Sequence, residues 1–183
     1  MSVSESRGEV RSEIDIALLE GEAADGVLGD LAEVLVDCVD GGASVGFEAP
    51  LPVETAREWW RKTMQDSSAL TWIASSAGRV VGVVRLLPSG YPNGRHRAEV
   101  AKLLVHRDAR GRGVATSLMH HLETGAIERG RWLLILDTQT GSPAERLYEK
   151  WGWQRLGVLE DHAYSPDGRL APTTFMSKRL AGS

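Results

Sequence analysis

The segment at residues 110–115, Arg-Gly-Arg-Gly-Val-Ala, constrains this chain more than any other stretch. It follows an apolar run at residues 98–105 that predicts a strand, and it precedes an apolar periodicity that predicts a helix ending at Gly130. The start of a helix leaves backbone N–H groups unpaired and carries partial positive charge. Gly111 and Gly113 allow this backbone to bend and to approach a phosphate without an intervening Cβ atom. The segment therefore predicts an anion cradle between a strand and a helix.

Other glycine motifs fit the chain poorly. The dinucleotide fingerprint needs a third glycine where Thr116 stands, and the chain contains no Gly-Lys pair for a Walker loop. Residues 42–46 (Gly-Ala-Ser-Val-Gly) have the spacing of a serine-hydrolase nucleophile elbow. A predicted helix precedes them and a proline-containing loop follows, which argues against that interpretation. A plain tight turn with solubilising arginines is the alternative that the glycines alone leave open.

Length, charge and cysteine content exclude several classes of protein. A chain of 183 residues and 19.9 kDa predicts one domain at residues 12–183, after a polar lead at residues 1–11 that we expect to be disordered. A net charge of -4 and a pI near 5.8 argue against general nucleic-acid binding. No run approaches the roughly 20 apolar residues of a membrane span. The single cysteine, Cys38, is expected in the core, excludes an intramolecular disulfide and fits a reducing cytoplasm.

Hydrophobic periodicity predicts an α/β fold with antiparallel hairpins first and a strand–helix–strand unit later. The apolar run at residues 133–136 is expected to be buried on both faces of the sheet. Ser142 and Pro143 predict the N-cap and the first turn of a short helix. The helices are expected at residues 28–39, 53–65, 114–129 and 142–151, and the strands at residues 13–19, 70–74, 80–87, 98–105, 133–136, 153–159 and 174–179.

Two segments of the chain match sequence motifs of a known superfamily. Residues 99–115 (EVAKLLVHRDARGRGVA) resemble motif A of the GNAT acetyltransferase superfamily, whose signature Arg/Gln-x-x-Gly-x-Gly/Ala is matched by Arg110, Gly113 and Ala115. Residues 144–153 (AERLYEKWGW) resemble its motif B, in the family's order along the chain. The resemblance implies the GNAT fold, a mixed sheet of about six to seven strands flanked by about four helices and splayed between the fourth and fifth strands.

Further segments resemble the tabtoxin-resistance group of that superfamily, which acetylates the amino group of a β-lactam-containing amino-acid toxin. They are residues 41–47 (GGASVGF), 97–100 (RAEV), 136–138 (LDT) and 166–170 (PDGRL).

Four positions depart from the patterns of these families. The tabtoxin-resistance group has histidine where this chain has Asp40 and Ala171. Arg107 stands where a proline is common in the superfamily, and Gly141 stands where motif B usually opens with asparagine. If either missing histidine contacts the toxin, the acceptor of this chain differs from it.

The resemblance implies acetyl-CoA as the co-substrate. Backbone N–H groups of the cradle would hold the pyrophosphate, and the main chain of the preceding strand would hold the pantetheine arm and the oxyanion. The cofactor-binding residues implied are Leu103, Leu104, Val105, Arg110, Gly111, Arg112, Gly113, Val114 and Ala115.

Three side chains are candidates for catalysis. An amine acceptor is mostly protonated at neutral pH, so a base assists its attack. Glu99 and Asp137 resemble the catalytic carboxylates of the tabtoxin-resistance group, and Tyr148 resembles the motif B tyrosine that protonates the CoA thiolate. The alternatives are an edge-strand charge for Glu99, a turn cap for Asp137 and helix-surface packing for Tyr148. The spacing leaves open whether the two carboxylates converge.

The sequence therefore predicts an acetyl-CoA-dependent N-acetyltransferase that acts on a small amino-acid-like or β-lactam-type amine. We expect no nucleic-acid or membrane partner, and a homodimer is possible as a habit of the family. No metal site is expected, because His120 and His121 point to different sides of a helix. A protein or polyamine acetyltransferase remains an alternative, as does a non-catalytic acyl-CoA-binding module. The presence of Glu99, Asp137 and Tyr148 together favours catalysis.

Overall fold

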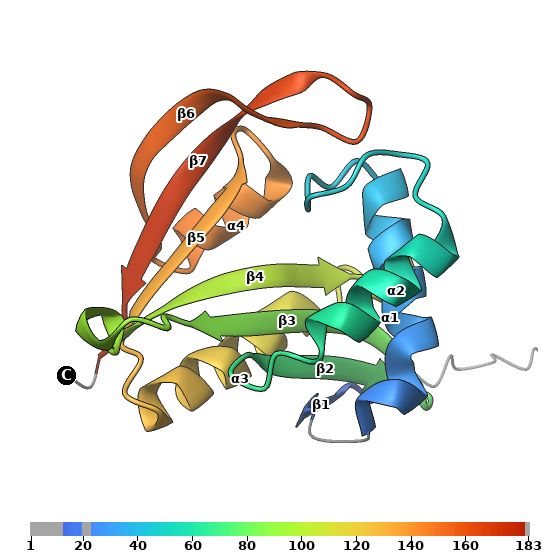
Figure 1. Cartoon of the computed structure of the whole chain (residues 1–183), viewed down its shortest axis with the longest axis horizontal. Coiled ribbons are helices and arrows are strands. Elements are labelled where there is room, and N and C mark those ends of the chain that lie inside the picture. The colour runs from blue at the N-terminus through green and yellow to red at the C-terminus, as the bar shows by residue number, and fades with distance from the viewer. Residues whose placement is uncertain (1–12, 20–22, 182–183) are drawn as a thin grey trace, which may run out of the picture.

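The computed structural model of the chain describes residues 13–19 and 23–181, so the lead expected at residues 1–11 lies outside the described part. Within it, seven strands form one mixed sheet in the order β1-β2-β3-β4-β5-β7-β6 (Figure 1). The strands are β1 (Asp15–Leu18), β2 (Leu70–Ser76), β3 (Arg79–Pro88), β4 (Arg97–Val105), β5 (Leu133–Gln139), β6 (Gln154–Tyr164) and β7 (Leu170–Arg179). The α-helices are α1 (Ala23–Asp40), α2 (Val53–Thr63), α3 (Val114–Glu128) and α4 (Pro143–Lys150).

Helices cover both faces of the sheet, as alternation along its strands requires. Val83 of β3 is buried in one core with Leu31 of α1 and Trp60 of α2. Its neighbour Val84 is buried in a second core with Leu118 of α3. Successive side chains of a strand point to opposite faces, so β3 contributes to both cores. None of the helices in the described residues is long and apolar enough to cross a membrane.

The fourth and fifth strands separate soon after they meet. Among the described residues, β4 and β5 pair only between residues 97–99 and 133–135, in parallel. Figure 1 shows the two strands diverging from this common point. The structure confirms the expected α/β class and the splay between these two strands.

Two predictions about the later elements have different outcomes. Ser142 caps α4 as expected, because its Oγ accepts a hydrogen bond from the Glu145 backbone N–H at 3.1 Å. The run at residues 133–136 is not buried on both faces, because only Leu134 and Leu136 are buried there. Leu134 and Leu136 belong to the α3 core, whereas Leu133 and Ile135 are half-buried on the opposite face.

We predict opposite effects of Gly→Ala at two helix positions. A Cβ atom at Gly125 of α3 would lie 2.5 Å from Cζ2 of buried Trp72, whereas one at Gly26 of α1 would have no atom within 4 Å. Gly125→Ala should lower the free energy of unfolding by about 1–2 kcal/mol, because the indole ring must shift. Gly26→Ala should raise it by up to about 1 kcal/mol through helix propensity. Urea unfolding measures both, and a Gly125→Ala variant as stable as the wild type would contradict this packing.

Candidate active site

A cavity of about 770 Å³ opens where β4 and β5 separate. Its wall also includes the α1–α2 loop, the start of α3, α4 and part of β6. Of the twelve site residues predicted from sequence, every one except Arg112 lines this cavity. Thr116, which was not predicted, lines it as well. The predicted cofactor and catalytic residues therefore lie around one cavity.

The cradle at the start of α3 has the backbone shape that its glycines predict. Gly111 and Gly113 have φ angles of 72° and 79°, in the left-handed region that favours glycine. Gly113 is the N-cap of α3 and supplies no side-chain cap. The first helical bond runs from the Ser117 N–H to the Gly113 carbonyl at 3.0 Å, so the N–H groups of residues 114–116 have no partner within the helix. These groups and the helix dipole could hold a phosphate.

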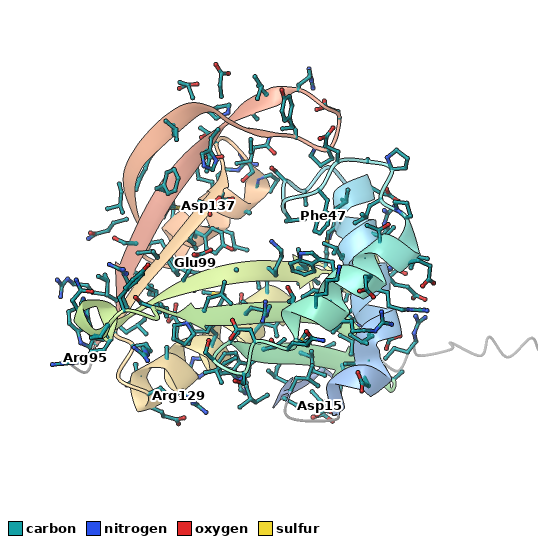
Figure 2. The ribbon with its side chains drawn as sticks, viewed as in Figure 1. Asp15, Phe47, Arg95, Glu99, Arg129 and Asp137 are labelled. Atoms are coloured by element: carbon teal, nitrogen blue, oxygen red, sulfur yellow. The ribbon has the colours of Figure 1, made fainter. Side chains whose placement is uncertain are left out.

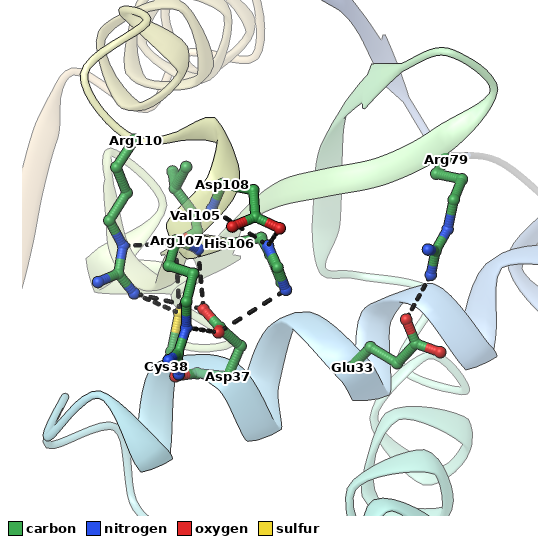
Figure 3. A network of polar contacts seen from close by, with 9 residues as sticks. All are labelled: Glu33, Asp37, Cys38, Arg79, Val105, His106, Arg107, Asp108 and Arg110. Carbon is green, nitrogen blue, oxygen red and sulfur yellow. Dashed lines mark hydrogen bonds and ion pairs between the residues drawn. The ribbon is translucent and has the colours of Figure 1, made fainter.

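A buried carboxylate on α1, Asp37, anchors the turn that leads into the cradle (Figure 3). Asp37 accepts hydrogen bonds from the Arg107 backbone N–H at 2.9 Å and from Arg107 Nε. Although burial acts to raise it, the pKa of Asp37 is lowered overall, because hydrogen bonds from Arg107 and the charges of His106 and Arg107 favour the ionised form. A proline at 107 would lack this N–H donor, so the departure from the family pattern serves the anchor.

Arg110 belongs to the same network. Its Nε donates to the Val105 carbonyl at 3.0 Å, and its guanidinium lies 3.5 Å from Asp37 Oδ2. Figure 3 shows the Arg110 side chain turned toward α1. The Cys38 thiol also donates to the Val105 carbonyl, and burial raises its pKa, so it stays a thiol. Arg110 therefore fixes the position of the cradle in addition to lining the cavity.

The end of β4 directs peptide groups toward the cavity. His106 N–H donates to the Val81 carbonyl at 2.9 Å, which places that residue's bonds on the β3 side. Because antiparallel ladders alternate, Leu104 also bonds toward β3, and the peptide groups of Leu103 and Val105 point the other way. The Val105 carbonyl is engaged by Arg110 and Cys38. The remaining groups could pair with the amides of an extended ligand.

The two predicted carboxylates come together at the point of separation. Glu99 is paired with Ile135, and Asp137 lies two residues further along β5 on the same face as Ile135. Figure 2 labels both carboxylates between the diverging strands. The edge-strand interpretation of Glu99 is wrong, because β4 is the central strand of the sheet. Asp137 lies within β5, which continues to Gln139, rather than at its end.

The surroundings of Glu99 favour a basic carboxylate. Burial and then the charge of Asp137 raise the pKa of Glu99, while the charge of Lys102 acts in the opposite direction. A raised pKa improves a carboxylate as a proton acceptor, provided that it is ionised at the working pH.

Tyr148 on α4 is buried against two tryptophans, which excludes simple packing at a helix surface. Its ring meets Trp151 and Trp153 edge-on, with centroids 5.8 Å and 5.7 Å away. Burial and the charge of Asp137 raise the pKa of Tyr148 far above its ordinary value. The phenol therefore stays protonated, and since Tyr148 lines the cavity it could donate a proton there.

Three ionisable residues that contribute to this region were not predicted from the sequence. Lys102 and His162 line the cavity, and Asp37 anchors the cradle turn. One sequence feature indicates Asp37, because this acidic residue stands on the otherwise apolar face of α1. For Lys102 the sequence pattern is misleading, because regular alternation along a strand would place its side chain on the face opposite Glu99.

Solved structures of other proteins share the fold described above. A ribosomal-protein-alanine N-acetyltransferase from Brucella melitensis superposes with a TM-score of 0.74 at 25% identity, over 90% of this chain and 99% of that one. The protein yncA from Salmonella typhimurium, solved with its cofactor acetyl-CoA, superposes with a TM-score of 0.74 at 17% identity, over 94% and 96% of the two chains.

Sequence comparison identifies the family. N-acetyltransferase 8F1 from Rattus norvegicus is 34% identical over 88 residues, which are 47% of this chain. The match spans 40% of the length of that relative. The model of the acetyltransferase (GNAT) family matches residues 39–153, which include the cradle, both carboxylates and Tyr148. The chain therefore belongs to the GNAT acetyltransferase family.

Proposed function

We propose that this chain transfers the acetyl group of acetyl-CoA directly to the amine of a small amino-acid-like or β-lactam-type acceptor. The observation that carries the proposal is that Glu99, Asp137 and Tyr148 line the same cavity as the unpaired N–H groups at the start of α3. A module that only bound acyl-CoA would need the cradle but not a carboxylate pair and a buried phenol beside it.

The donor half of the cavity suits CoA. The N–H groups of residues 114–116 would bind its pyrophosphate, and the peptide groups of Leu103 and Val105 would pair with its pantetheine amides. A peptide N–H of β4 would then donate a hydrogen bond to the acetyl carbonyl and stabilise the oxyanion that develops there.

The acceptor half supplies the proton transfers. Glu99, assisted by Asp137, takes a proton from the ammonium, and the free amine attacks the thioester carbonyl. The C–N bond forms in this attack, and the C–S bond breaks as the tetrahedral intermediate collapses. The departing thiolate receives the Tyr148 proton, because that buried phenol is the protonated group beside Asp137. The attacking nitrogen loses its second proton to the resulting phenolate, which leaves a neutral amide and restores Tyr148.

The acceptor end favours a small molecule. The α1–α2 loop and the β6–β7 hairpin close over it, joined by a hydrogen bond from the Ala49 N–H to the Pro166 carbonyl at 2.9 Å (Figure 1). A protein acceptor, which the name of the Brucella structure gives for that protein, would need an open groove at this end.

Asp40 lines a smaller cavity of about 370 Å³ that shares Gly42 and Gln139 with the large one. The presence of Asp40 where the tabtoxin-resistance group has histidine therefore bears on the choice of acceptor.

A second copy of the chain is the protein partner that we propose. β6 lies at the edge of the sheet, and its side chains Leu156 and Leu159 are 64% and 51% exposed. An edge strand presents unpaired backbone groups, so this edge offers both hydrogen bonds and apolar surface to another copy.

Release of free thiol from acetyl-CoA with a panel of amines tests the proposed function. We expect acceptor-dependent release with free amino acids or with tabtoxinine-β-lactam, in preference to polyamines and lysine peptides. Glu99→Gln and Tyr148→Phe should each lower kcat by about 100-fold or more, the usual contribution of acid–base groups. Binding of CoA without turnover of any amine would instead support the regulatory module.

The cradle predicts a selective loss of CoA binding at one of two matched glycines. Gly113 and Gly130 stand at opposite ends of α3 with φ angles of 79° and 69°, and a Cβ atom at either has no neighbour within 4 Å. Alanine at each should cost about 1–2 kcal/mol of stability through backbone strain. Only Gly113→Ala should raise the Kd for CoA, by about tenfold or more. Calorimetric titration measures it, and equal affinity in both variants would remove the cradle from CoA binding.

The carboxylate pair predicts a shift in the pH profile. Since burial and Asp137 raise the pKa of Glu99, kcat/KM should fall with decreasing pH through a limb above the ordinary glutamate range, as the base becomes protonated. Asp137→Asn removes one cause of the raised pKa and should move this limb to lower pH. Asp15→Asn, on the far edge strand β1, is the control that should leave the profile unchanged. A limb that stays in place in Asp137→Asn would show that Asp137 does not act on Glu99.

A further inference from the structure

Lys102 occupies an irregular position in β4. The ladder between β3 and β4 pairs Val83 with Leu104 and Arg85 with Ala101, so Lys102 and Leu103 together oppose Val84. Lys102 has a φ angle of 53°, which is rare outside glycine. An extra residue in one strand is a β-bulge, and bulges redirect the side chains of the strand that carries them.

The bulge moves Lys102 to the face of the sheet that carries Glu99. Val100 is buried in the core under α3, whereas Leu104 is buried in the core under α1 and α2. In a regular strand these two residues would share a face, so the change of face occurs between them. The Lys102 Nζ lies 5.2 Å from the ring centroid of Trp59 on α2, which places the lysine on the α1–α2 side.

The position of the Lys102 ammonium is held by aromatic contacts. Trp59 receives it over its ring face, and Phe47 of the α1–α2 loop packs edge-on against Trp59 at 5.5 Å. A Cβ atom at Gly46 would lie 3.8 Å from the Nζ, so the same loop passes directly beside the ammonium. Such contacts fix a cation in place without neutralising its charge.

Among the described residues, Lys102 lines the same cavity as the two carboxylates without forming an ion pair with either. Glu99, Lys102 and Asp137 all line the cavity, and the charges of Asp137 and Glu99 act on Lys102. Within the described part of the chain, Lys102 forms no ion pair with either carboxylate. A partly desolvated ammonium without an ion-pair partner favours an anion close by.

We propose that Lys102 binds the carboxylate of the acceptor, so that the substrate is a small molecule with both an amine and a carboxylate. This inference rests on the proposed function, since the amine of the same molecule must reach Glu99 and Asp137. Glu99, Asp137 and Lys102 together match a zwitterionic acceptor. Its ammonium would lie toward Glu99 and Asp137, and its carboxylate would lie toward Lys102. A polyamine would bring a second cation toward Lys102, and the like charges would repel.

Steady-state kinetics with matched acceptors tests this proposal. Each amino acid is compared with its carboxamide, which keeps the amine and the side chain but lacks the negative charge. Lys102→Met removes the charge and leaves a side chain with the same backbone strain, whereas Lys102→Arg retains the charge. Lys62→Met, on the exposed side of α2, is the control for loss of a lysine.

We expect the wild type to prefer the amino acid. Lys102→Met should raise the KM for the amino acid by about 10- to 100-fold, as expected for loss of one charge-assisted hydrogen bond, and leave the KM for the carboxamide nearly unchanged. Lys102→Arg should retain part of the preference, and Lys62→Met all of it. CoA affinity should be unchanged in Lys102→Met, which confirms that the variant folds.

Three results would overturn the proposal. Equal turnover of amino acid and carboxamide by the wild type would show that no carboxylate is recognised. A parallel loss for both acceptors in Lys102→Met would assign the lysine to the chemistry or to the structure of the cavity. Both results leave the proposed acetyl transfer intact. Absence of turnover with every amine, despite CoA binding, would overturn the proposed function itself.

Discussion

The separation of β4 from β5 after Glu99 and Ile135 is the constraint on which the rest of this structure depends. Backbone N–H and C=O groups need partners, and two central strands that part leave one side of each without its neighbouring strand. On β5 the loss of hydrogen-bond partners is limited to one side, because β7 pairs with the whole length of β5 on the other side. On β4 the peptide groups of Leu103 and Val105 face the cavity instead. A ligand with amide groups of its own can replace the missing strand, and this is why the cavity and the sheet form one feature.

Opening a sheet at its centre requires other contacts to hold the exposed strand. At its far end, Asp37 binds the turn after β4 through the backbone and side chain of Arg107, and Arg110 bonds back to the last carbonyl of the strand. These bonds connect α1 to the cradle across about 70 residues of chain, and they keep the start of α3 in line with β4. The pKa of Asp37 is lowered, so the anchor persists above the acidic range and weakens only as pH falls far enough to protonate that carboxyl.

Local chemistry explains which features could be predicted from the sequence. The cradle lies where strand, glycines and helix follow one another, and the α4 cap depends on Ser142 and its immediate neighbours. The convergence of Glu99 and Asp137 could not be derived, because it depends on a parallel register between strands about 35 residues apart. Lys102 was missed for another reason, since one inserted residue reverses the alternation that places side chains. The expected burial of residues 133–136 failed because the splay leaves one face of β5 without a covering helix.

The electrostatics of the acceptor end connect recognition to catalysis. In the free protein, burial and Asp137 raise the pKa of Glu99 and Lys102 lowers it, so this proposed base lies between two opposing charges. In the proposed complex, the acceptor's carboxylate neutralises Lys102 and removes the influence that lowers the pKa. Glu99 would then be a stronger base toward this acceptor than toward an amine that lacks a carboxylate. An amine without a carboxylate would leave Lys102 charged and the base weaker. The same lysine would thus select the acceptor by binding it and by making Glu99 most basic when the correct molecule is present.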